Sequence, residues 1–319
     1  MTHSLTPTVD PSTGLPPADG PRSARRRSNR QLGGRAANLL YVPALVLFAI
    51  FTVYPLLKGL DLSFTNWNGY SPRRSYVGLD NYRRLLDDAN VRKALQNTFI
   101  YGFGSTAVQQ VLGLGLALAL DRAIRGRNLA RAIIYLPALV SPVVMGTMYY
   151  LFFQYNNGVL NDVAGWFGGE KVAWLSDADT SLVIIVMVNS LQFVGVSMII
   201  YLAGLQSIPI MYTEAGMLDG ASAWQRFRYI TVPLLQPAFA TSIVLNLIGG
   251  LKLFDVIKVL TGGGPGYSTN SLSTFISVTY FDAQSAGYAS AMGVVLFLII
   301  AVFTVVTNTV LNRRRLEQM

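Results

Sequence analysis

The chain has 319 residues, of which 52% are hydrophobic and only 13% are charged, with a formal net charge of +9. A soluble domain of this length usually carries about 25% charged residues, so the composition indicates a membrane protein. The chain has no cysteine and a single histidine, His3. This excludes disulfides and leaves almost no ligands for zinc or iron–sulfur sites.

Residues 1–35 differ in composition from the rest of the chain. They are rich in Pro, Ser, Gly and Arg and contain almost nothing that a core could bury, which predicts a disordered basic tail. Its arginines and the apolar run after them would suit an export signal. That run is too long and lacks a small-residue cleavage site, so we interpret it as an uncleaved first span.

Six stretches can cross a membrane. A helix needs roughly 20 mostly apolar residues to cross the hydrocarbon core, and five stretches reach this length plainly. The sixth, Ala238–Leu260, is apolar in its first half and then carries Lys252, Asp255 and Lys258. Together they predict an all-α polytopic membrane domain over residues 38–311. The five plain spans are Asn38–Leu60, Asn97–Leu120, Ala132–Phe153, Ser181–Leu205 and Tyr288–Leu311.

The loops between these spans differ in charge. Basic residues concentrate on the side of the two termini, and the opposite loops contain fewer. By the positive-inside rule we expect both termini in the cytoplasm, including a C-terminal tail, 312–319. Omitting the span at 238–260 would place Arg313, Arg314 and Arg315 outside, so six spans fit best. Arginines that set topology also explain most of the net charge, which leaves little support for nucleic-acid binding.

Small residues recur within the second and fourth spans. They let two helix backbones approach closely in a membrane, where van der Waals packing drives helix association. We therefore expect helix contacts at Gly102, Gly104, Gly113, Gly115, Ser190, Gly195 and Ser197.

A long polar insert, residues 206–236, joins the fourth and fifth spans on the arginine-rich side. Residues 210–218 favour a helix, and the turn sequence at Gly220 should end it. An S-x-x-Q capping box at Ser222 predicts a second short helix, which Pro233 should bring to an end. The sequence therefore predicts two short helices at the membrane surface with a bend at Gly220.

The charges of the insert indicate its role. An amphipathic anchor on the membrane surface would carry a basic polar face. The first helix instead carries Glu214 and Asp219 and has no Lys or Arg. A site for docking another protein explains this acidic end and the tight turn better than an anchor does.

At these residues the chain resembles the EAA loop of ABC-importer permeases. The family pattern is E-A-A, three residues, G, nine residues, then I-x-L-P. Gly216 replaces the second alanine and Val232 the leucine, and Gly216 should loosen the first helix by up to about 1 kcal/mol relative to Ala. The resemblance implies that this loop inserts into a cleft on a cytoplasmic ATPase. The implied coupling residues are Glu214, Ala215, Gly216, Asp219, Gly220, Ile230 and Pro233.

The resemblance extends over nearly all of residues 38–311. Residues 62–86 look like the external segment after the first span of maltose-type sugar permeases, and residues 251–276 resemble their "F-D…LT-x-GGP…T" stretch. It implies a type I importer permease fold, in the cytoplasmic membrane of a prokaryote. Such permeases import a sugar, from monosaccharide to oligosaccharide or a related polyol, by alternating access.

The resemblance also implies partners. They are a second, homologous permease subunit that completes a heterodimer, two copies of a cytoplasmic ATP-binding subunit, and an extracytoplasmic solute-binding protein. ATP and Mg²⁺ would bind to the ATPase, and this chain would bind no cofactor.

The sequence itself lacks the groups of an ATPase or an enzyme. A Walker A loop needs G-x-x-x-x-G-K-[ST], and "TGGGPGYST" at 261–269 has the glycines without the lysine. The single histidine is in the tail, and no paired carboxylates stand out in the spans. We therefore expect no catalytic and no metal site in this chain.

Polar residues within the spans suggest a substrate pathway. Asn189 and Gln192 are neighbours on one helix face, and neutral amides beside aromatic faces suit a carbohydrate. The alternative for the amides is hydrogen bonding between helices. For Lys252, Asp255 and Lys258, the alternative to a substrate contact is a row of charges near the outer leaflet that neutralise one another. The candidate pathway residues are Asn189, Gln192, Phe193, Asn246, Gly249, Phe254 and Asp255.

Two other functions compete with an ATP-driven importer. A secondary transporter driven by an ion gradient would show inverted repeats and an intramembrane carboxylate, and only Asp255 is a candidate for the latter. An integral membrane enzyme would need clustered carboxylates or a metal site at the interface. Neither pattern stands out in the sequence.

Overall fold

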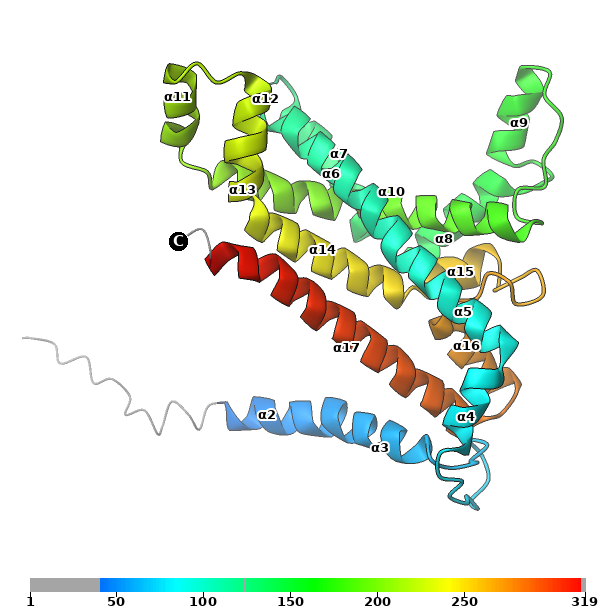
Figure 1. The fold of residues 1–319 in the computed structure, drawn as a ribbon. Helices are drawn as coiled ribbons and strands as arrows, with labels where there is room; N and C mark the ends of the chain where they lie inside the picture. The colour runs from blue at the N-terminus through cyan, green and yellow to red at the C-terminus, as the bar shows by residue number, and fades with distance from the viewer. Residues whose placement is uncertain (1–40, 123, 317–319) are drawn as a thin grey trace, which may run out of the picture. The chain divides into compact units, whose positions relative to one another are not determined.

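The computed structural model describes residues 41–122 and 124–316, which are drawn in colour in Figure 1. The chain divides into two compact units, residues 1–54 and residues 55–319. The described part of the first unit is helical: α2 (Val42–Phe48) starts with a proline in its first turn, and a π-helical turn, η1 (Ala49–Val53), follows it. The predicted tail 1–35 lies outside the described residues.

The second unit is helical throughout its regular structure, and the only β-type pairing among the described residues is an isolated bridge between Thr65 and Tyr76. Helix α17 continues to Leu316, beyond the predicted end of the sixth span at Leu311. The further elements are α3 (Tyr54–Leu62), α4 (Asp80–Asp87), α5 (Ala89–Phe99), η2 (Ile100–Gly104), α6 (Ser105–Asp121), α7 (Arg127–Leu139), α8 (Pro142–Phe153), α9 (Val159–Trp166), α10 (Ala178–Gln206), α11 (Ile210–Leu218), α12 (Ala223–Arg226), η3 (Phe227–Thr231), α13 (Val232–Leu234), α14 (Gln236–Leu251), α15 (Asp255–Leu260), α16 (Leu272–Ser277), η4 (Val278–Asp282) and α17 (Ala286–Leu316).

Four described helical stretches are long and apolar enough to cross a membrane: Val42–Leu62, Ala89–Asp121, Ala178–Gln206 and Ala286–Leu311. Two bent helix pairs pass the same test, which raises the count to six if each pair is one span. This upper count agrees with the six predicted spans. The structure differs from the prediction in the third and fifth spans, which are not single straight helices.

The third span, predicted as one helix over 132–153, is bent by 99° between α7 and α8. Proline has no N–H and disfavours helical conformation in the residue before it. Val140 and Ser141 are accordingly extended, and Pro142 starts the second helix of the pair.

The fifth span, predicted over 238–260, was placed wrongly at its C-terminal end. Helix α14 ends at Leu251, and the charged part forms the separate short helix α15. Two glycines before this break, Gly249 and Gly250, lower helix propensity there. The bent helix pair that is long and apolar enough to form this span is Ala223–Leu234 with Gln236–Leu251, and its bend is 65°.

Glycines let the helices of the second unit touch backbone to backbone. A Cβ on Gly250 of α14 would lie 2.8 Å from the Gly102 Cα, and one on Gly113 of α6 would lie 2.5 Å from the Ser197 Cβ of α10. A Cβ added to Gly195 of α10 would lie 2.5 Å from the Ile134 carbonyl oxygen of α7. These contacts confirm the expected close packing. Gly115 is an exception, because no atom lies within 4 Å of its added Cβ.

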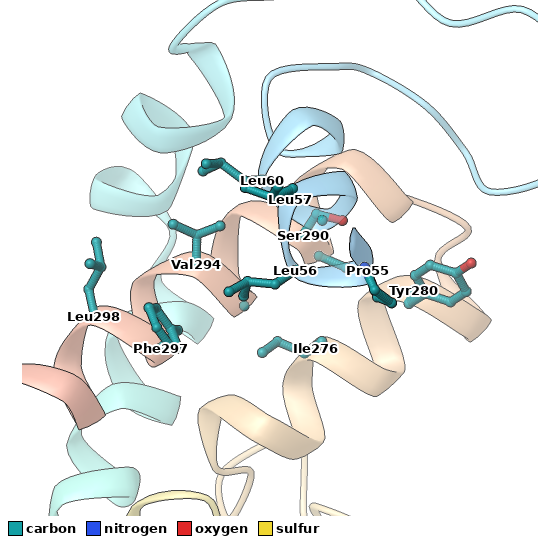
Figure 2. A pocket seen from close by; sticks show the side chains of 13 residues that line it. Pro55, Leu56, Leu57, Leu60, Ile276, Tyr280, Ser290, Val294, Phe297 and Leu298 are labelled. Carbon is teal, nitrogen blue, oxygen red and sulfur yellow. The ribbon is translucent and has the colours of Figure 1, made fainter. Parts of the chain in front are cut away.

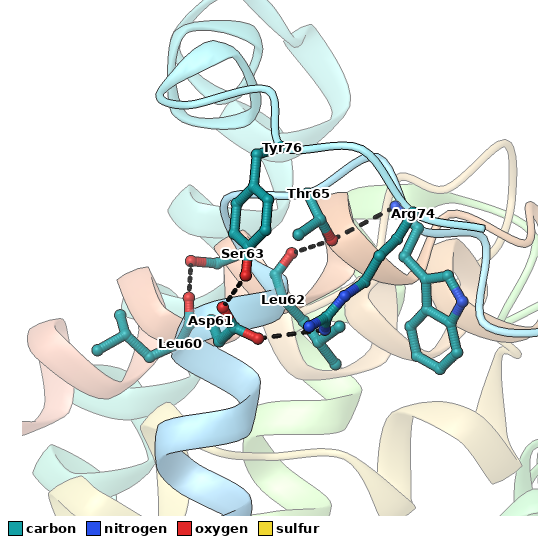
Figure 3. A network of polar contacts seen from close by, with 8 residues as sticks. Leu60, Asp61, Leu62, Ser63, Thr65, Arg74 and Tyr76 are labelled. Atoms are coloured by element: carbon teal, nitrogen blue, oxygen red, sulfur yellow. Dashed lines mark hydrogen bonds and ion pairs between the residues drawn. The ribbon is translucent and has the colours of Figure 1, made fainter. Parts of the chain in front are cut away.

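The segment after α3 is held by a polar network at the end of that helix (Figure 3). One Asp61 carboxylate oxygen accepts a 2.7 Å hydrogen bond from the Tyr76 hydroxyl, and the other lies 3.1 Å from the Arg74 Nη1 atom. The bond to this carboxylate raises the pKa of Tyr76. The Gly287 N–H donates to the Trp67 carbonyl at 2.8 Å, which ties the segment to the start of α17.

Candidate functional site

The two helices of the predicted insert are present and bend where expected. Helix α11 covers Ile210–Leu218, and Gly220 adopts a left-handed φ of +75°. The Ala221 N–H donates to the Gly216 carbonyl at 2.9 Å, and the Gly220 N–H donates to the Met217 carbonyl at 3.1 Å. These bonds satisfy carbonyls at the helix end, and glycine adopts this conformation without steric cost.

The second helix starts with the predicted capping box. The Gln225 N–H donates to the Ser222 Oγ at 3.3 Å, and the Ser222 N–H donates to the Gln225 Oε1 at 2.7 Å. The helix continues through η3 to α13, which ends one residue after Pro233. Figure 1 shows this hairpin, which we call the coupling loop (residues 206–236), between α10 and α14.

Gly216 has a packing role in the coupling loop that the sequence did not reveal. It is buried, and a Cβ added to it would lie 2.9 Å from the Ile230 side chain. The Arg226 side chain lies 3.4 Å from the same added Cβ, and its Nη1 atom donates a 2.6 Å hydrogen bond to the Ala221 carbonyl. The glycine that departs from the E-A-A pattern therefore lets the second helix pack against α11.

Several large apolar side chains of the coupling loop are exposed. Leu218 is 89% exposed, Tyr229 74% and Trp224 69%. Glu214 and Asp219 are exposed beside them. Exposed apolar side chains of this kind suit a contact with another protein. A cavity of about 360 Å³ at the bend is lined by Gly216, Asp219, Gly220, Ala221, Gln225, Arg226, Tyr229 and Ile230.

The predicted amides in the spans are buried, and two of them bond to neighbouring segments. The Asn246 Nδ2 atom donates to the Ser197 Oγ at 2.6 Å. The Gln192 Nε2 atom lies 3.4 Å from the Val140 carbonyl, and its side-chain oxygen has no hydrogen-bond partner among the described residues. Asn189 is buried, and its main-chain carbonyl accepts a 3.2 Å bond from the Gln109 Nε2 atom. Among the described residues, no hydrogen bond joins these three amides to one another.

Phe254 lies in a different environment, at the break between α14 and α15. It lines a cavity of about 540 Å³ together with residues of α16 and η4. Asp255 and Phe193 are partly buried, and Gly249 is exposed. The other residues of this cavity, which we call the Phe254 cavity, are Ser273, Ile276, Ser277, Tyr280 and Phe281.

The sequence prediction missed the hydroxyl and aromatic residues of the Phe254 cavity. Ser273, Ser277 and Tyr280 recur at helical spacing, which places them on one face of α16 and η4. This spacing is the signal that could have found them. Aromatic rings beside hydroxyl groups suit a ligand with both apolar faces and hydrogen-bonding groups.

A second hollow is an apolar groove of about 420 Å³ between α3, α16 and α17 (Figure 2). Leu56, Leu57 and Leu60 of α3 line it opposite Val294 and Phe297 of α17. It contains none of the predicted site residues and few groups that could bind a polar substrate. We therefore do not assign it to the substrate pathway.

Comparison with known proteins places these features in a family. Residues 111–317 match the family described as the binding-protein-dependent transport system inner membrane component. A probable starch degradation products transport system permease protein of Thermoanaerobacterium thermosulfurigenes is 35% identical over 88% of this chain and 94% of that protein. The trehalose/maltose transport system permease protein of Thermococcus litoralis is 32% identical over 87% and 94%, respectively.

The fold is also similar to that of solved transporters. A chain of a bacterial ABC transporter that imports the acidic polysaccharide alginate superposes with a TM-score of 0.77, at 25% identity, over 88% of this chain and 96% of that chain. The same kind of transporter in complex with a periplasmic protein carrying an alginate pentasaccharide gives a TM-score of 0.76. With its apolar helices, this chain is a multi-pass membrane protein with a type I importer permease fold.

Proposed function

Because the chain belongs to the family of binding-protein-dependent transport system inner membrane components, we propose that it is the permease subunit of an ATP-driven ABC importer for a sugar. The observation that carries the proposal is the coupling loop, which presents exposed Leu218, Trp224 and Tyr229. Relatives that are named as permeases for starch degradation products and for trehalose and maltose support the substrate class.

The energy for transport comes from other subunits. We propose two copies of a cytoplasmic ATPase, which hold the ATP and Mg²⁺, and a second, homologous permease that completes a heterodimer. An extracytoplasmic solute-binding protein delivers the sugar. The chain binds no cofactor, and both of its termini are cytoplasmic, which the distribution of basic residues supports.

Coupling follows from the geometry of the loop. Glu214, Ala215, Asp219 and Gly220 are exposed and contact the ATPase, whereas Gly216 and Ile230 pack the two loop helices on each other. Pro233 lies one residue before the end of α13, at the bend into α14. ATP-driven closure of the ATPase displaces the loop, and the spans respond by switching between inward-facing and outward-facing states.

We propose that the substrate pathway includes Asn189, Gln192, Phe193, Asn246, Gly249, Phe254 and Asp255. The Phe254 cavity adds Ser273, Ser277, Tyr280 and Phe281 to it. In this cavity the rings contact the apolar face of a sugar ring, and the hydroxyl groups bond to sugar hydroxyls. The cavity lining contains no charged side chain.

Reconstitution tests this function. The chain is purified with its partner permease and ATPase, placed in liposomes, and supplied with binding protein and radiolabelled sugar. We expect uptake when ATP and Mg²⁺ are enclosed in the liposomes and the binding protein and sugar are outside, and none with a proton or sodium gradient alone. Uptake driven by an ion gradient without ATPase would contradict the proposal and support a secondary transporter.

The Phe254 cavity gives a prediction for the same assay. Phe254→Ala removes a ring that contacts the sugar, so the KM for sugar uptake should rise about tenfold, equivalent to about 1.4 kcal/mol. Phe254→Tyr keeps the ring and should stay near the original KM. The ATPase rate without sugar serves as the folding control and should be unchanged in both variants. An unchanged KM in Phe254→Ala would remove Phe254 from the pathway.

A further inference from the structure

A cluster of polar side chains joins three helices in the interior of the second unit. We call it the polar cluster: Gln110 of α6, Ser197 and Tyr201 of α10, and Ser242 and Asn246 of α14. The Tyr201 hydroxyl donates a short hydrogen bond to the Gln110 side-chain oxygen. The Asn246 Nδ2 atom donates to the Ser197 Oγ at 2.6 Å and to the Ser242 Oγ at 3.4 Å. Through these bonds, α10 is linked to α6 on one side and to α14 on the other.

The helices are also packed tightly at the level of the polar cluster. The Tyr201 ring meets the Phe239 ring edge to face, with 5.0 Å between centroids and 63° between planes. Gly113 of α6 packs directly on Ser197, where an added Cβ would lie 2.5 Å from the serine Cβ. Tyr201, Ser197 and Ser242 are fully buried. Buried hydroxyls that keep their hydrogen bonds fix the relative position of the helices that carry them.

The polar cluster holds the two helices that carry the coupling loop. Helix α10 ends at Gln206, shortly after Tyr201, and α14 begins at Gln236, shortly before Ser242. Leu235, at the bend into α14, is fully buried in the same core as Tyr201. Any displacement of the coupling loop therefore reaches this core through both of its ends.

Helix α6, in contrast, does not adjoin the coupling loop along the chain. A cavity of about 670 Å³ lies between them, lined by Leu118 and Asp121 of α6, by Arg122 directly after α6, and by Trp224 and Phe227 of the coupling loop, among others. Because this space separates the loop from the end of α6, a push from the loop reaches α6 by way of α10 and α14.

We propose that Tyr201 and Gln110 are positioning residues that make α6 move with α10 and α14 when the coupling loop is displaced. The inference rests on the proposed function, since it requires a loop that an ATPase moves. Packed helices switch between discrete arrangements as rigid bodies, and the Tyr201–Gln110 bond assigns α6 to the body that carries the loop. Without this bond, part of the loop movement is lost before it reaches α6.

The test compares two buried tyrosines in the reconstituted complex. Tyr201→Phe removes only the hydroxyl that bonds to Gln110. Tyr101→Phe is the matched control, because Tyr101 is also fully buried and donates one bond, of 2.7 Å, to the Thr269 carbonyl in the segment before α16. The quantity measured is the number of sugar molecules imported per ATP hydrolysed, together with the ATPase rate and the melting temperature of the complex.

We expect Tyr201→Phe to keep the ATPase rate and to lower sugar imported per ATP roughly threefold, the factor by which losing one intramembrane hydrogen bond typically shifts an equilibrium between two helix arrangements. Tyr101→Phe should keep the original ratio. Gln110→Met removes the acceptor and should reproduce the effect, and the double variant should show no further loss. Gln110→Met also supplies the test if Tyr201→Phe fails to assemble.

The outcomes separate this inference from the proposed function. If the unmodified complex shows no ATP-driven uptake, the proposed function fails. If it imports sugar, and Tyr201→Phe and Gln110→Met keep its ratio of sugar to ATP, only the positioning role is overturned. Equal loss of the ratio in Tyr101→Phe would also overturn it, because the effect would then belong to any buried hydroxyl.

Discussion

Gly220→Asp should reduce ATP-driven sugar uptake at least tenfold without preventing membrane insertion. The glycine is at the exposed bend of the coupling loop, in a left-handed conformation that aspartate tolerates better than most residues. The damage therefore arises at the contact with the ATPase. A carboxylate that is buried there without a partner costs several kcal/mol, enough to dissociate the ATPase. Co-purification of the ATPase with the permease measures this loss directly.

Gly126→Asp is the matched control for this variant. Gly126 has a similar left-handed φ of +82°, has open space around an added Cβ, and lies in the loop before α7 on the same expected side of the membrane. The Gly126→Asp variant should still co-purify with the ATPase and keep most of the ATP-driven sugar uptake. If Gly220→Asp also binds the ATPase and imports sugar at the normal rate, the coupling loop is not the docking site.

Gly250→Ala should lower the stability of the folded chain by about 1–3 kcal/mol, the typical cost of overpacking a tight core. The added methyl group would lie 2.8 Å from the Gly102 Cα and 2.9 Å from the Tyr101 carbonyl oxygen. Both are backbone atoms, which cannot turn away as a flexible side chain does. The melting temperature of the purified complex in detergent should fall accordingly.

The adjacent residue provides the control. Gly249 lies in the same helix, and an added Cβ there would meet no atom within 4 Å. Gly249→Ala should keep or raise the melting temperature, because alanine favours a helix by up to about 1 kcal/mol over glycine. A similar fall in both variants would mean that helix flexibility, not the contact with Gly102, sets the stability.

The sequence predicted those parts of the site that depend on neighbours along the chain. Ser222 and Gln225 form the expected capping box, and the expected bend lies at Gly220, which adopts a left-handed φ. Both features depend only on residues within three or four positions of one another, so they can be predicted without knowledge of the fold. Most of the spans could also be predicted, because each depends on hydrophobicity over about 20 consecutive residues, whereas the span at 238–260 also required the charges of the loops.

Features that depend on contacts between distant residues could not be read in this way. A hydropathy window reports apolar content and not direction, so the bend at Ser141 and the end of α14 at Leu251 were missed. The Phe254 cavity combines residues around 254 with residues 273–281, whose proximity follows from the packing of α16. For Gly216, the sequence suggested only a looser helix, because its contact with Ile230 requires the folded hairpin.

The exposed Trp224 of the coupling loop can report ATPase docking through its own fluorescence. Of the four tryptophans, Trp224 is 69% exposed on the surface that we assign to the ATPase, and Trp166 is 81% exposed at the end of α9. Trp67 and Trp174 are partly buried. Replacing the other three with phenylalanine would leave Trp224 as a single fluorophore, whose emission shifts to shorter wavelength as water leaves its surroundings. Docking and release of the ATPase would then be visible in real time, without an added label.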